Sequence, residues 1–285
     1  MQLLESDVTT KEVLSWNGVH LIHFQGSACS QKTRIFLNLK GIDWRSHHLD
    51  LSAQKNYESW FLGINPRGLV PVLIHDGAVH IESNDILDYL EQSFPQPALI
   101  PANQHGEIIA ALRDENDLHM DLRTLTMRFV IPRFLAQKKS EAMRRYAEDS
   151  GSVLGDHDLQ KPIELAFWRD YAEHGITDSQ VKLSAQAFKK AYTKLEAQLQ
   201  HSQFLTGDDL TLLDIAWFIY TERLISAGYP FEKLHPNVLN WYQVLAARSE
   251  FSKEVVSPAP LRFVTAFLHA IQRLRGRTLE RTAEL

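Results

Sequence analysis

The fold is decided by the stretch Leu69-Val70-Pro71-Val72-Leu73-Ile74-His75-Asp76-Gly77-Ala78-Val79-His80-Ile81. Two apolar runs flank Asp76-Gly77, a dipeptide that favours the two-residue turn of a β-hairpin. We therefore predict antiparallel strands over residues 69–74 and 78–81. Because Pro71 cannot donate a backbone hydrogen bond to a ladder, we expect it at an edge or in a turn. An ordinary turn is the default for Val70–Pro71, and a cis bond is the alternative.

The residues on either side of this hairpin predict a small α/β layer. Residues 19–24 are apolar and β-prone, and the helical pattern that follows them is expected to end at Gly41. Residues 44–49 have the pattern of a second strand. After the hairpin, Ser83 is a candidate N-cap of a closing helix. The order βαβαββα predicts one compact α/β domain over residues 17–95.

Beyond a linker at residues 95–103, the pattern is helical. Two helix starts have the spacing of a capping box, Thr177 with Gln180 and Thr211 with Asp214. We predict one long helix that includes Leu118 to Phe129, and a polar, looser segment at 138–161. The second domain is therefore expected to be all-helical over residues 104–270. The tails are residues 1–16 and 271–285.

Composition narrows the class of protein. The chain has 285 residues, 44% of them hydrophobic and 23% charged, which is typical of a soluble globular protein. The formal net charge of -5 and the absence of a nucleic-acid-binding motif argue against DNA or RNA partners. No apolar stretch has the length of a membrane span, and the N-terminus lacks the pattern of a secretory signal. We therefore expect a cytoplasmic protein without membrane contact.

Cysteine and histidine usage argues against disulfides and metals. Cys29 is the single cysteine, so an internal disulfide is excluded and a reducing compartment is favoured. The thirteen histidines form no HExxH motif. His47 and His48 are expected on opposite faces of a strand. No metal site is expected.

The first candidate for chemistry is the strand-to-helix junction Gly26-Ser27-Ala28-Cys29-Ser30. A helix N-terminus offers unpaired N–H groups and a partial positive charge, both of which stabilise an anion. The Ser27 hydroxyl can donate a hydrogen bond to a thiolate in the same place. Lowering a thiol pKa from about 8.5 by about two units requires about 2.7 kcal/mol of extra stabilisation of the thiolate. The alternative is that Ser27 only caps the helix.

Three further features have the chemistry of a peptide-binding site. A cis bond before Pro71 would leave the backbone N–H and C=O of Val70 free to pair with an extended peptide. At a helix start, Glu82 can hold an ammonium group and Ser83 a carboxylate. Lys55 lies in a polar loop, where it can reach a terminal carboxylate. The plainer interpretations are a turn, an N-cap beside a surface acid, and a solvated lysine.

Taken together, these segments resemble the N-terminal domain of glutathione transferases. The matching segments are residues 27–34 (SACSQKTR), 65–73 (NPRGLVPVL) and 82–90 (ESNDILDYL). Residues 210–216 (LTLLDIA) resemble the C-terminal folding motif of the same family. The resemblance covers roughly residues 18–255. It implies a thioredoxin-like domain that binds glutathione, followed by an all-α domain that binds the second substrate.

The resemblance also implies roles for individual residues. Ser27 is expected to stabilise the glutathione thiolate. The cysteinyl part of glutathione is assigned to Leu69, Val70 and Pro71, with the Val70 backbone as its partner. Glu82 and Ser83 are expected to hold the γ-glutamyl end, and Lys55 the glycyl carboxylate.

The second substrate and the assembly state are also implied by the resemblance. We expect Arg123 and Met127 to line the pocket for an electrophilic small molecule, although a solvated helix face is the plainer interpretation of Arg123. Members of the family usually form homodimers and act in detoxification. The expected partners are therefore glutathione, an electrophile and a second copy of the chain.

The class within the family stays open. Ser27 and Cys29 match the zeta-class pattern Ser-Ser-Cys, but Ala28 replaces the second serine. Cys29 also resembles the catalytic cysteine of tetrachlorohydroquinone reductive dehalogenase, and the segment at 138–161 resembles dehalogenase-like relatives. The Asn-Pro-Arg-Gly run is similar to that of bacterial β-etherases. Cys29 is accordingly a structural thiol, a second-step nucleophile or an accidental oxidation site.

Two alternative functions follow from these features. The first is Cys29-dependent glutathione chemistry, such as reductive dehalogenation, thiol transfer or ether cleavage. The second is a non-catalytic interaction module, for which the apolar segment from Leu261, followed by Arg273, Arg275 and Arg277, gives some support. We rank a helix packed onto the C-terminal domain above that membrane-surface interpretation.

Overall fold

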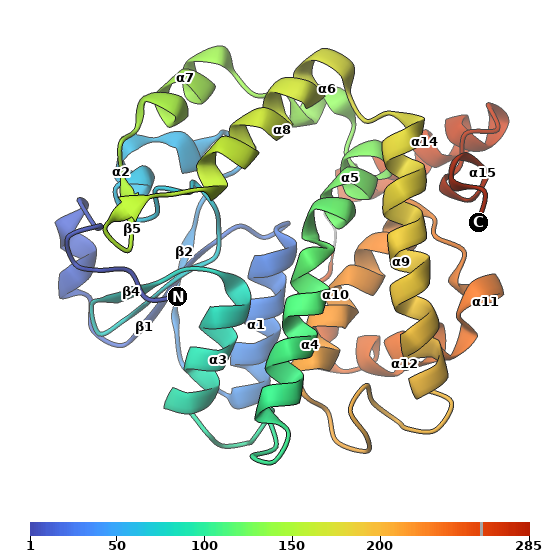
Figure 1. Cartoon of the computed structure of the whole chain (residues 1–285), viewed down its shortest axis with the longest axis horizontal. Helices are drawn as coiled ribbons and strands as arrows, with labels where there is room; N and C mark the ends of the chain where they lie inside the picture. The colour runs from blue at the N-terminus through green and yellow to red at the C-terminus, as the bar shows by residue number, and fades with distance from the viewer. Residues whose placement is uncertain (257–258) are drawn as a thin grey trace. The chain divides into compact units, whose positions relative to one another are not determined.

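The computed structural model describes residues 1–256 and 259–285, and these form two compact units (Figure 1). The first unit comprises residues 1–93 and 137–175, and the second comprises residues 94–136 and 176–285. Residues 257–258, within the expected helical domain 104–270, lie outside the described part of the chain. The division differs from the expected boundaries at one main point, because residues 137–175 pack with the N-terminal unit.

The first unit is built on a mixed four-stranded sheet in the order β2-β1-β3-β4. The strands are β1 (Val19–His23), β2 (Arg45–His48), β3 (Val72–His75) and β4 (Ala78–His80). β1 pairs in parallel with β2, whereas β1 with β3 and β3 with β4 pair antiparallel. The predicted βαβ unit and hairpin are therefore confirmed.

The hairpin turn has the backbone that its dipeptide predicts. Asp76 and Gly77 have φ angles of 48° and 81°, as a two-residue turn with positive φ at both positions requires. A Cβ on Gly77 would lie 2.2 Å from the carbonyl oxygen of Leu14, so the N-terminal segment also requires glycine here.

Two helices of this unit, α1 (Ala28–Lys40) and α3 (Ser83–Ser93), pack against each other. α1 ends at Gly41, whose φ of 63° confirms the predicted stop. A buried ion pair of 2.6 Å joins Lys40 Nζ to Glu91 on α3. Two short elements, η2 (Lys55–Tyr57) and α2 (Ser59–Leu62), follow β2.

The N-terminal segment, which the sequence suggested to be a tail, packs against the sheet. Leu3, Val8 and Val13 are buried, the last in η1 (Lys11–Ser15). The Leu3 N–H donates to the carbonyl oxygen of Val79 over 2.9 Å, so the segment covers the edge strand β4.

The polar segment at 138–161 is regular, so the prediction of a looser segment was wrong. It contains α7 (Ser140–Glu148), the hairpin β5 (Ser152–Val153) and β6 (Asp156–His157), and the start of α8 (Gln160–His174). Ala142 and Tyr146 lie one helical turn apart on α7 and are both buried. The Tyr146 ring packs on Tyr57, with ring centroids 4.8 Å apart. Ala142, Tyr146 and the half-buried Met143 form the apolar face of α7, which is only nine residues long and otherwise mostly polar.

The hairpin of this segment is held by Asp7. Its carboxylate accepts hydrogen bonds from the Ser152 hydroxyl (2.6 Å) and from the backbone N–H groups of Leu154 (2.9 Å) and Gly155 (3.0 Å). Leu4 N–H completes the set at 3.0 Å. The N-terminal segment and residues 138–161, called the inserted segment from here on, therefore stabilise each other.

Among the described residues of the second unit, the regular elements are helices, as predicted. Its helices are α4 (His105–Asp117), α5 (His119–Phe129), α6 (Arg133–Ala136), α9 (Asp178–Gln198), α10 (Leu212–Ala227), α11 (Phe231–Leu234), α12 (Pro236–Ala246), α13 (Ser249–Ser252), α14 (Ala259–Leu274) and α15 (Leu279–Ala283). α5 packs against both α9 and α10. The long helix predicted to include Leu118 is interrupted there, because Leu118 is the C-cap of α4 and the N-cap of α5.

Both predicted capping boxes are present, at Thr177 for α9 and at Thr211 for α10. The box of α10 lies in the core, where Asp214 Oδ1 also accepts the indole N–H of Trp241 over 2.9 Å.

The apolar helix α14 lies in the second unit and is fastened to α5. The Thr265 hydroxyl donates to the carbonyl oxygen of Val130 (3.3 Å), and His269 Nε2 lies 3.2 Å from that of Phe129. Phe263 and Phe267 remain exposed. Among the residues described, the structure contains no helix with the length and apolarity needed to cross a membrane.

Candidate functional site

Strand register brings four of the predicted site segments to one end of the sheet. Ile22 of β1 pairs with Val72 of β3, and Leu73 of β3 pairs with His80 of β4. The end of β1, the start of β3 and the end of β4 therefore lie at the same end of the sheet, together with the end of the parallel strand β2. The chain continues from these points into Ser27, Val70–Pro71, Glu82–Ser83 and Lys55 respectively.

Ser27 is the N-cap of α1. Its side-chain oxygen accepts the backbone N–H of Ser30 over 3.3 Å, and its φ and ψ of -76° and 125° are those of an N-cap residue. A hydroxyl that accepts with its oxygen still has its proton to donate. Ser27 is half-buried, so that proton can reach a ligand at the helix start.

Cys29 lies in the first turn of α1 and is also half-buried. Ser27 is the N-cap with extended dihedral angles and Cys29 is the second residue of the helix, so the two side chains leave different positions at the helix start. Cys29 lies close to the partial positive charge of the helix N-terminus.

The turn that carries Ser27 is fixed by Arg34, a residue that sequence analysis missed. Arg34 is 2% exposed, and its guanidinium donates to the carbonyl oxygens of Phe24 (3.3 Å) and Gln25 (3.1 Å). These two residues lie between β1 and the serine. In the sequence, Arg34 follows Ser27 by seven residues, and this spacing alone does not identify its contacts with Phe24 and Gln25.

The Val70–Pro71 peptide bond is cis, which the sequence had left as the alternative. The preceding loop is held by side-chain amides. The Asn65 amide donates to the carbonyl oxygen of Leu69 and the Asn56 amide to that of Gly68, both over 2.8 Å.

The start of α3 differs in detail from the prediction. Ser83 is the first residue of the helix rather than its N-cap, and it is buried. Glu82 precedes it with a φ of 66°. The carbonyl oxygen of Glu82 accepts the N–H of Ile86 over 2.8 Å, which begins the helical ladder.

Glu82 makes an ion pair with Arg67, which sequence analysis did not assign to the site. Arg67 Nη1 donates to Glu82 Oε1 over 2.6 Å, and Nε and Nη2 donate to Asp158 Oδ1 over 2.9 and 2.8 Å. Burial lowers the pKa of Arg67, but the two carboxylates outweigh it and the net pKa is raised. Arg67 lies in the quoted Asn-Pro-Arg-Gly run. Its partner Asp158 is too distant in sequence to be identified from spacing.

Lys55 begins η2 and is exposed. Its Nζ lies 2.8 Å from Glu58 Oε1, so its position agrees with a solvated surface lysine as well as with a ligand contact. The role in binding a carboxylate stays a prediction.

The predicted second-substrate residues Arg123 and Met127 lie on α5 in the second unit and are both half-buried. Arg128, on the same helix, pairs with Asp178 over 2.6 Å and donates to the carbonyl oxygen of Ile176. The assignment of Arg123 and Met127 to a pocket stays a prediction.

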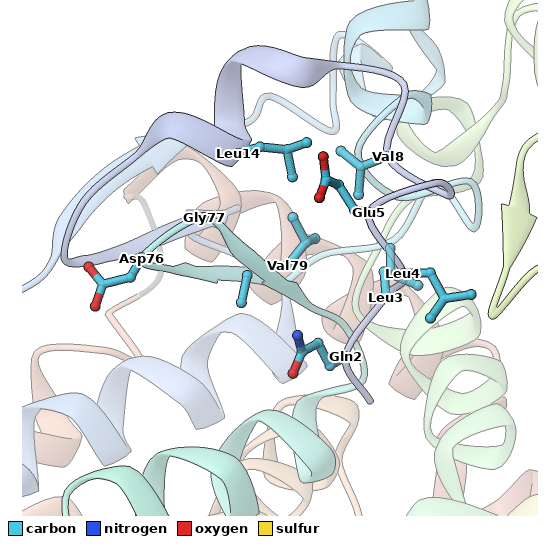
Figure 2. Close-up of a pocket in the computed structure, with 10 residues that line it drawn as sticks. Gln2, Leu3, Leu4, Glu5, Val8, Leu14, Asp76, Gly77 and Val79 are labelled. Carbon is cyan, nitrogen blue, oxygen red and sulfur yellow. The ribbon is translucent and has the colours of Figure 1, made fainter.

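A separate cavity lies between the N-terminal segment and the β3–β4 turn. Figure 2 shows Leu3, Val8, Leu14 and Val79 among its lining side chains, with Glu5 beside them. Its lining includes none of the site residues predicted from the sequence.

The described residues contain no group of three or more His, Cys, Asp or Glu side chains suited to a metal ion. His47 Nε2 instead lies 2.9 Å from His20 Nδ1, and both rings stack on Trp16. Burial, followed by the charges of His20 and Arg45, lowers the pKa of His47.

Family profiles match two separate parts of the chain. The profile of the glutathione S-transferase N-terminal domain matches residues 26–93, and that of the C-terminal domain matches residues 169–243.

Three curated relatives match over most of the chain. Protein LigF of Sphingobium sp. strain NBRC 103272 / SYK-6 is 42% identical over 80% of this chain and 89% of its own. Glutathione S-transferase Z2 of Arabidopsis thaliana is 35% identical over 68% and 71%. Tetrachloro-P-hydroquinone reductive dehalogenase of Sphingobium chlorophenolicum is 25% identical over 84% and 96%.

The crystal structure of β-etherase LigF superposes with a TM-score of 0.67, covering 83% of this chain and 98% of that one, with 26% identity. Against several other curated relatives the chain spans only 37% to 41% of their length. The two profiles, the long alignments and the superposition agree on one family. The chain belongs to the glutathione S-transferase family.

Proposed function

We propose that this protein is a glutathione transferase, which binds glutathione and stabilises its thiolate for attack on an electrophilic small molecule. The observation that carries the proposal is the geometry of Ser27. Its oxygen accepts the Ser30 N–H, which leaves the hydroxyl proton available for a hydrogen bond to a ligand at the start of α1. The helix N-terminus adds a partial positive charge in the same place.

The proposed reaction is a nucleophilic substitution or addition by the thiolate. Ser27 donates a hydrogen bond to the glutathione sulfur, which lowers the thiol pKa and raises the thiolate fraction at neutral pH. The thiolate forms a carbon–sulfur bond with the electrophile. In a substitution, the leaving group departs with the electron pair of the bond that breaks.

The rest of glutathione is assigned to the neighbouring segments. The Val70 backbone, with Leu69 and Pro71, pairs with the cysteinyl part. Glu82 offers a carboxylate to the γ-glutamyl ammonium, and Ser83 with the start of α3 offers donors to its carboxylate. Lys55 is the proposed partner of the glycyl carboxylate.

The second-substrate residues and the assembly state are proposed from the family resemblance and from helix α5. Arg123 and Met127 of α5 are proposed to contact the electrophile. A cytoplasmic homodimer with a role in detoxification is the expected biological form. Size-exclusion chromatography with light scattering tests the dimer.

Ether cleavage is the second candidate, favoured by the similarity to β-etherase LigF. In this reaction the thiolate attacks the carbon of an aryl ether and the phenolate leaves. Dehalogenase-type chemistry is a third, in which the Cys29 thiolate attacks the sulfur of a glutathione thioether. That step gives a mixed disulfide, and the departing carbon keeps the electron pair of the broken carbon–sulfur bond and takes a proton from water to give the reduced product.

The test is conjugation of glutathione to a generic aromatic electrophile at several pH values, together with titration of the bound thiol. Wild type is compared with Ser27→Ala, Cys29→Ala and the exposed control Ser93→Ala. We expect that Ser27→Ala, and neither of the other variants, loses most of the conjugation rate and raises the apparent pKa of the bound glutathione thiol.

Other outcomes point elsewhere. Loss of activity only in Cys29→Ala would favour the cysteine-dependent chemistry. If wild type neither turns over nor binds glutathione, the non-catalytic module becomes the better proposal.

A further inference from the structure

Arg67 is shared by two carboxylates from distant parts of the first unit. Nε and Nη2, one edge of its planar fork, are taken by Asp158 Oδ1, and Nη1 is left for Glu82 Oε1. A guanidinium is rigid and planar, so a contact along one edge fixes where the remaining N–H groups point. Asp158 therefore sets the direction from which Arg67 approaches Glu82.

Asp158 is itself held firmly. Its side chain is 3% exposed, and its Oδ2 accepts the backbone N–H of Lys161 over 3.2 Å. It lies between β6 and α8, in the hairpin region that Asp7 anchors. Tyr146 of α7 also donates to the carbonyl oxygen of Arg67 over 2.8 Å. The inserted segment thus makes hydrogen bonds with both the backbone and the side chain of Arg67.

Glu82 is less constrained at its other side. Its side chain is 37% exposed, and among the described residues its carboxylate contacts fall on Oε1. An ionised carboxylate has acceptor sites on both oxygens, so Oε2 stays available to a cationic ligand. The direction of Oε2 depends on where Arg67 holds Oε1.

We propose that Asp158 is a positioning residue for the ammonium group of a γ-glutamyl ligand, acting through Arg67 on Glu82. This rests on the proposed function, in which Glu82 receives that ammonium. Asp158 lies between the two profile matches, at 26–93 and 169–243, so the contact comes from a segment that neither profile covers. The inserted segment is thereby a part of the glutathione-binding apparatus.

The test measures binding of two probes by titration calorimetry. The first is glutathione, and the second is the analogue in which a glutaryl group replaces γ-glutamyl, so that only the amino group is lost. Asp158→Asn removes the charge with little change of shape, and Arg67→Lys keeps the charge but loses the fork. Glu82→Gln and the double variant Asp158→Asn/Glu82→Gln complete the cycle, and the exposed neighbour Asp156→Asn is the control.

We expect Asp158→Asn and Arg67→Lys each to weaken glutathione binding about tenfold, as coupling within a hydrogen-bonded network allows. Their affinity for the deamino analogue stays at the wild-type value. The double variant loses no more than Glu82→Gln alone, and Asp156→Asn binds both probes as wild type does. Arg67→Lys carries the test if Asp158→Asn does not fold.

Two results overturn the inference. Equal loss of affinity for both probes would mean that Asp158 only supports the fold, and unchanged affinity for glutathione would mean that it has no part in binding. Failure of wild type to bind glutathione is distinct, because it removes the proposed function itself and the inference with it.

Discussion

The guanidinium of Arg34 donates a hydrogen bond to the carbonyl oxygen of Gln25 over 3.1 Å, so α1 holds the turn from which it begins. A second bond reaches the carbonyl oxygen of Phe24 over 3.3 Å. These carbonyls precede Ser27 directly, and without the guanidinium they lose buried donors. The position of the Ser27 hydroxyl therefore depends on a side chain two helical turns away.

Replacing Arg34 is expected to affect both stability and binding. Arg34→Met leaves buried carbonyl oxygens without these donors and should lower the free energy of unfolding by about 1–3 kcal/mol. It should also weaken glutathione binding, because the turn before Ser27 loses its support. Urea unfolding and calorimetry check the two effects. Arg45→Met, at an exposed position of β2, is the control, and an equal loss there would contradict the role of Arg34.

Asp7 gives a prediction in acid. Burial raises the pKa of its carboxyl, but hydrogen bonds from Ser152 and from the backbone of Gly155, Leu4 and Leu154 outweigh burial and lower it below the ordinary 3.8. A depressed carboxyl pKa stabilises the fold above the unfolded value, and this is lost as the pH falls through the folded value.

Asp7→Asn should therefore lower the free energy of unfolding at pH 7 by about 1–3 kcal/mol. The difference from wild type should shrink below pH 3.8. Hydrogen exchange should also quicken at residues 152–157, where the hairpin loses its acceptor. Exchange that stays at the wild-type rate there would mean that Asp7 does not anchor the hairpin.

The strands and turns of the first unit could be predicted because each has a local cause. The Asp76-Gly77 dipeptide fixes the hairpin, and Gly41 ends α1. In the second unit, the capping box at Thr211 likewise needs only residues three apart. These signals lie within a few positions of each other, and the structure follows them.

The hydrogen-bond network around the candidate site could not be predicted from the sequence, because its partners lie far apart along the chain. Arg67 and Asp158 are 91 residues apart, and Asp7 and Ser152 are 145 apart. Such contacts depend on how the inserted segment packs within the first unit. Its helix α7 has only two buried residues, Ala142 and Tyr146. The apolar residues of α7 recur at helical spacing, but over only nine residues of a strongly polar segment, which is a weak signal.

Because the pKa of His80 is lowered in the folded state, we predict that the free energy of unfolding decreases at mildly acidic pH. Burial lowers its pKa to about 4, and the N-terminal ammonium and His75 add to the effect. Its ring stacks on Tyr89 at 3.8 Å between centroids, and its buried Nε2 has no hydrogen-bond partner among the described residues. The folded state therefore keeps the ring neutral while the unfolded chain protonates it near pH 6.5.

The unfolded state binds the extra proton between these two pKa values, so stability falls as the pH drops from 6.5 towards 4. This residue should account for about 3 kcal/mol of the loss in unfolding free energy between pH 7 and pH 4. His80→Phe keeps the stacking and should flatten the profile. Urea unfolding at pH 7, 5.5 and 4.5 checks it, and parallel profiles for variant and wild type would contradict the assignment.

Asp214 is the residue on which we expect the helical unit to depend most. Its buried carboxylate accepts the backbone N–H groups of Thr211 (2.9 Å) and Leu205 (3.0 Å) and the indole N–H of Trp241. Asp214→Ala leaves three buried donors unpaired and should cost about 3 kcal/mol or more. Thr177→Ala removes the exposed capping box of α9 and should cost only about 1 kcal/mol. Urea unfolding measures both losses of unfolding free energy. We expect the larger loss at Asp214, because donors left unpaired in the core cannot bind water instead. Equal losses would mean that burial of the network adds nothing to the cap.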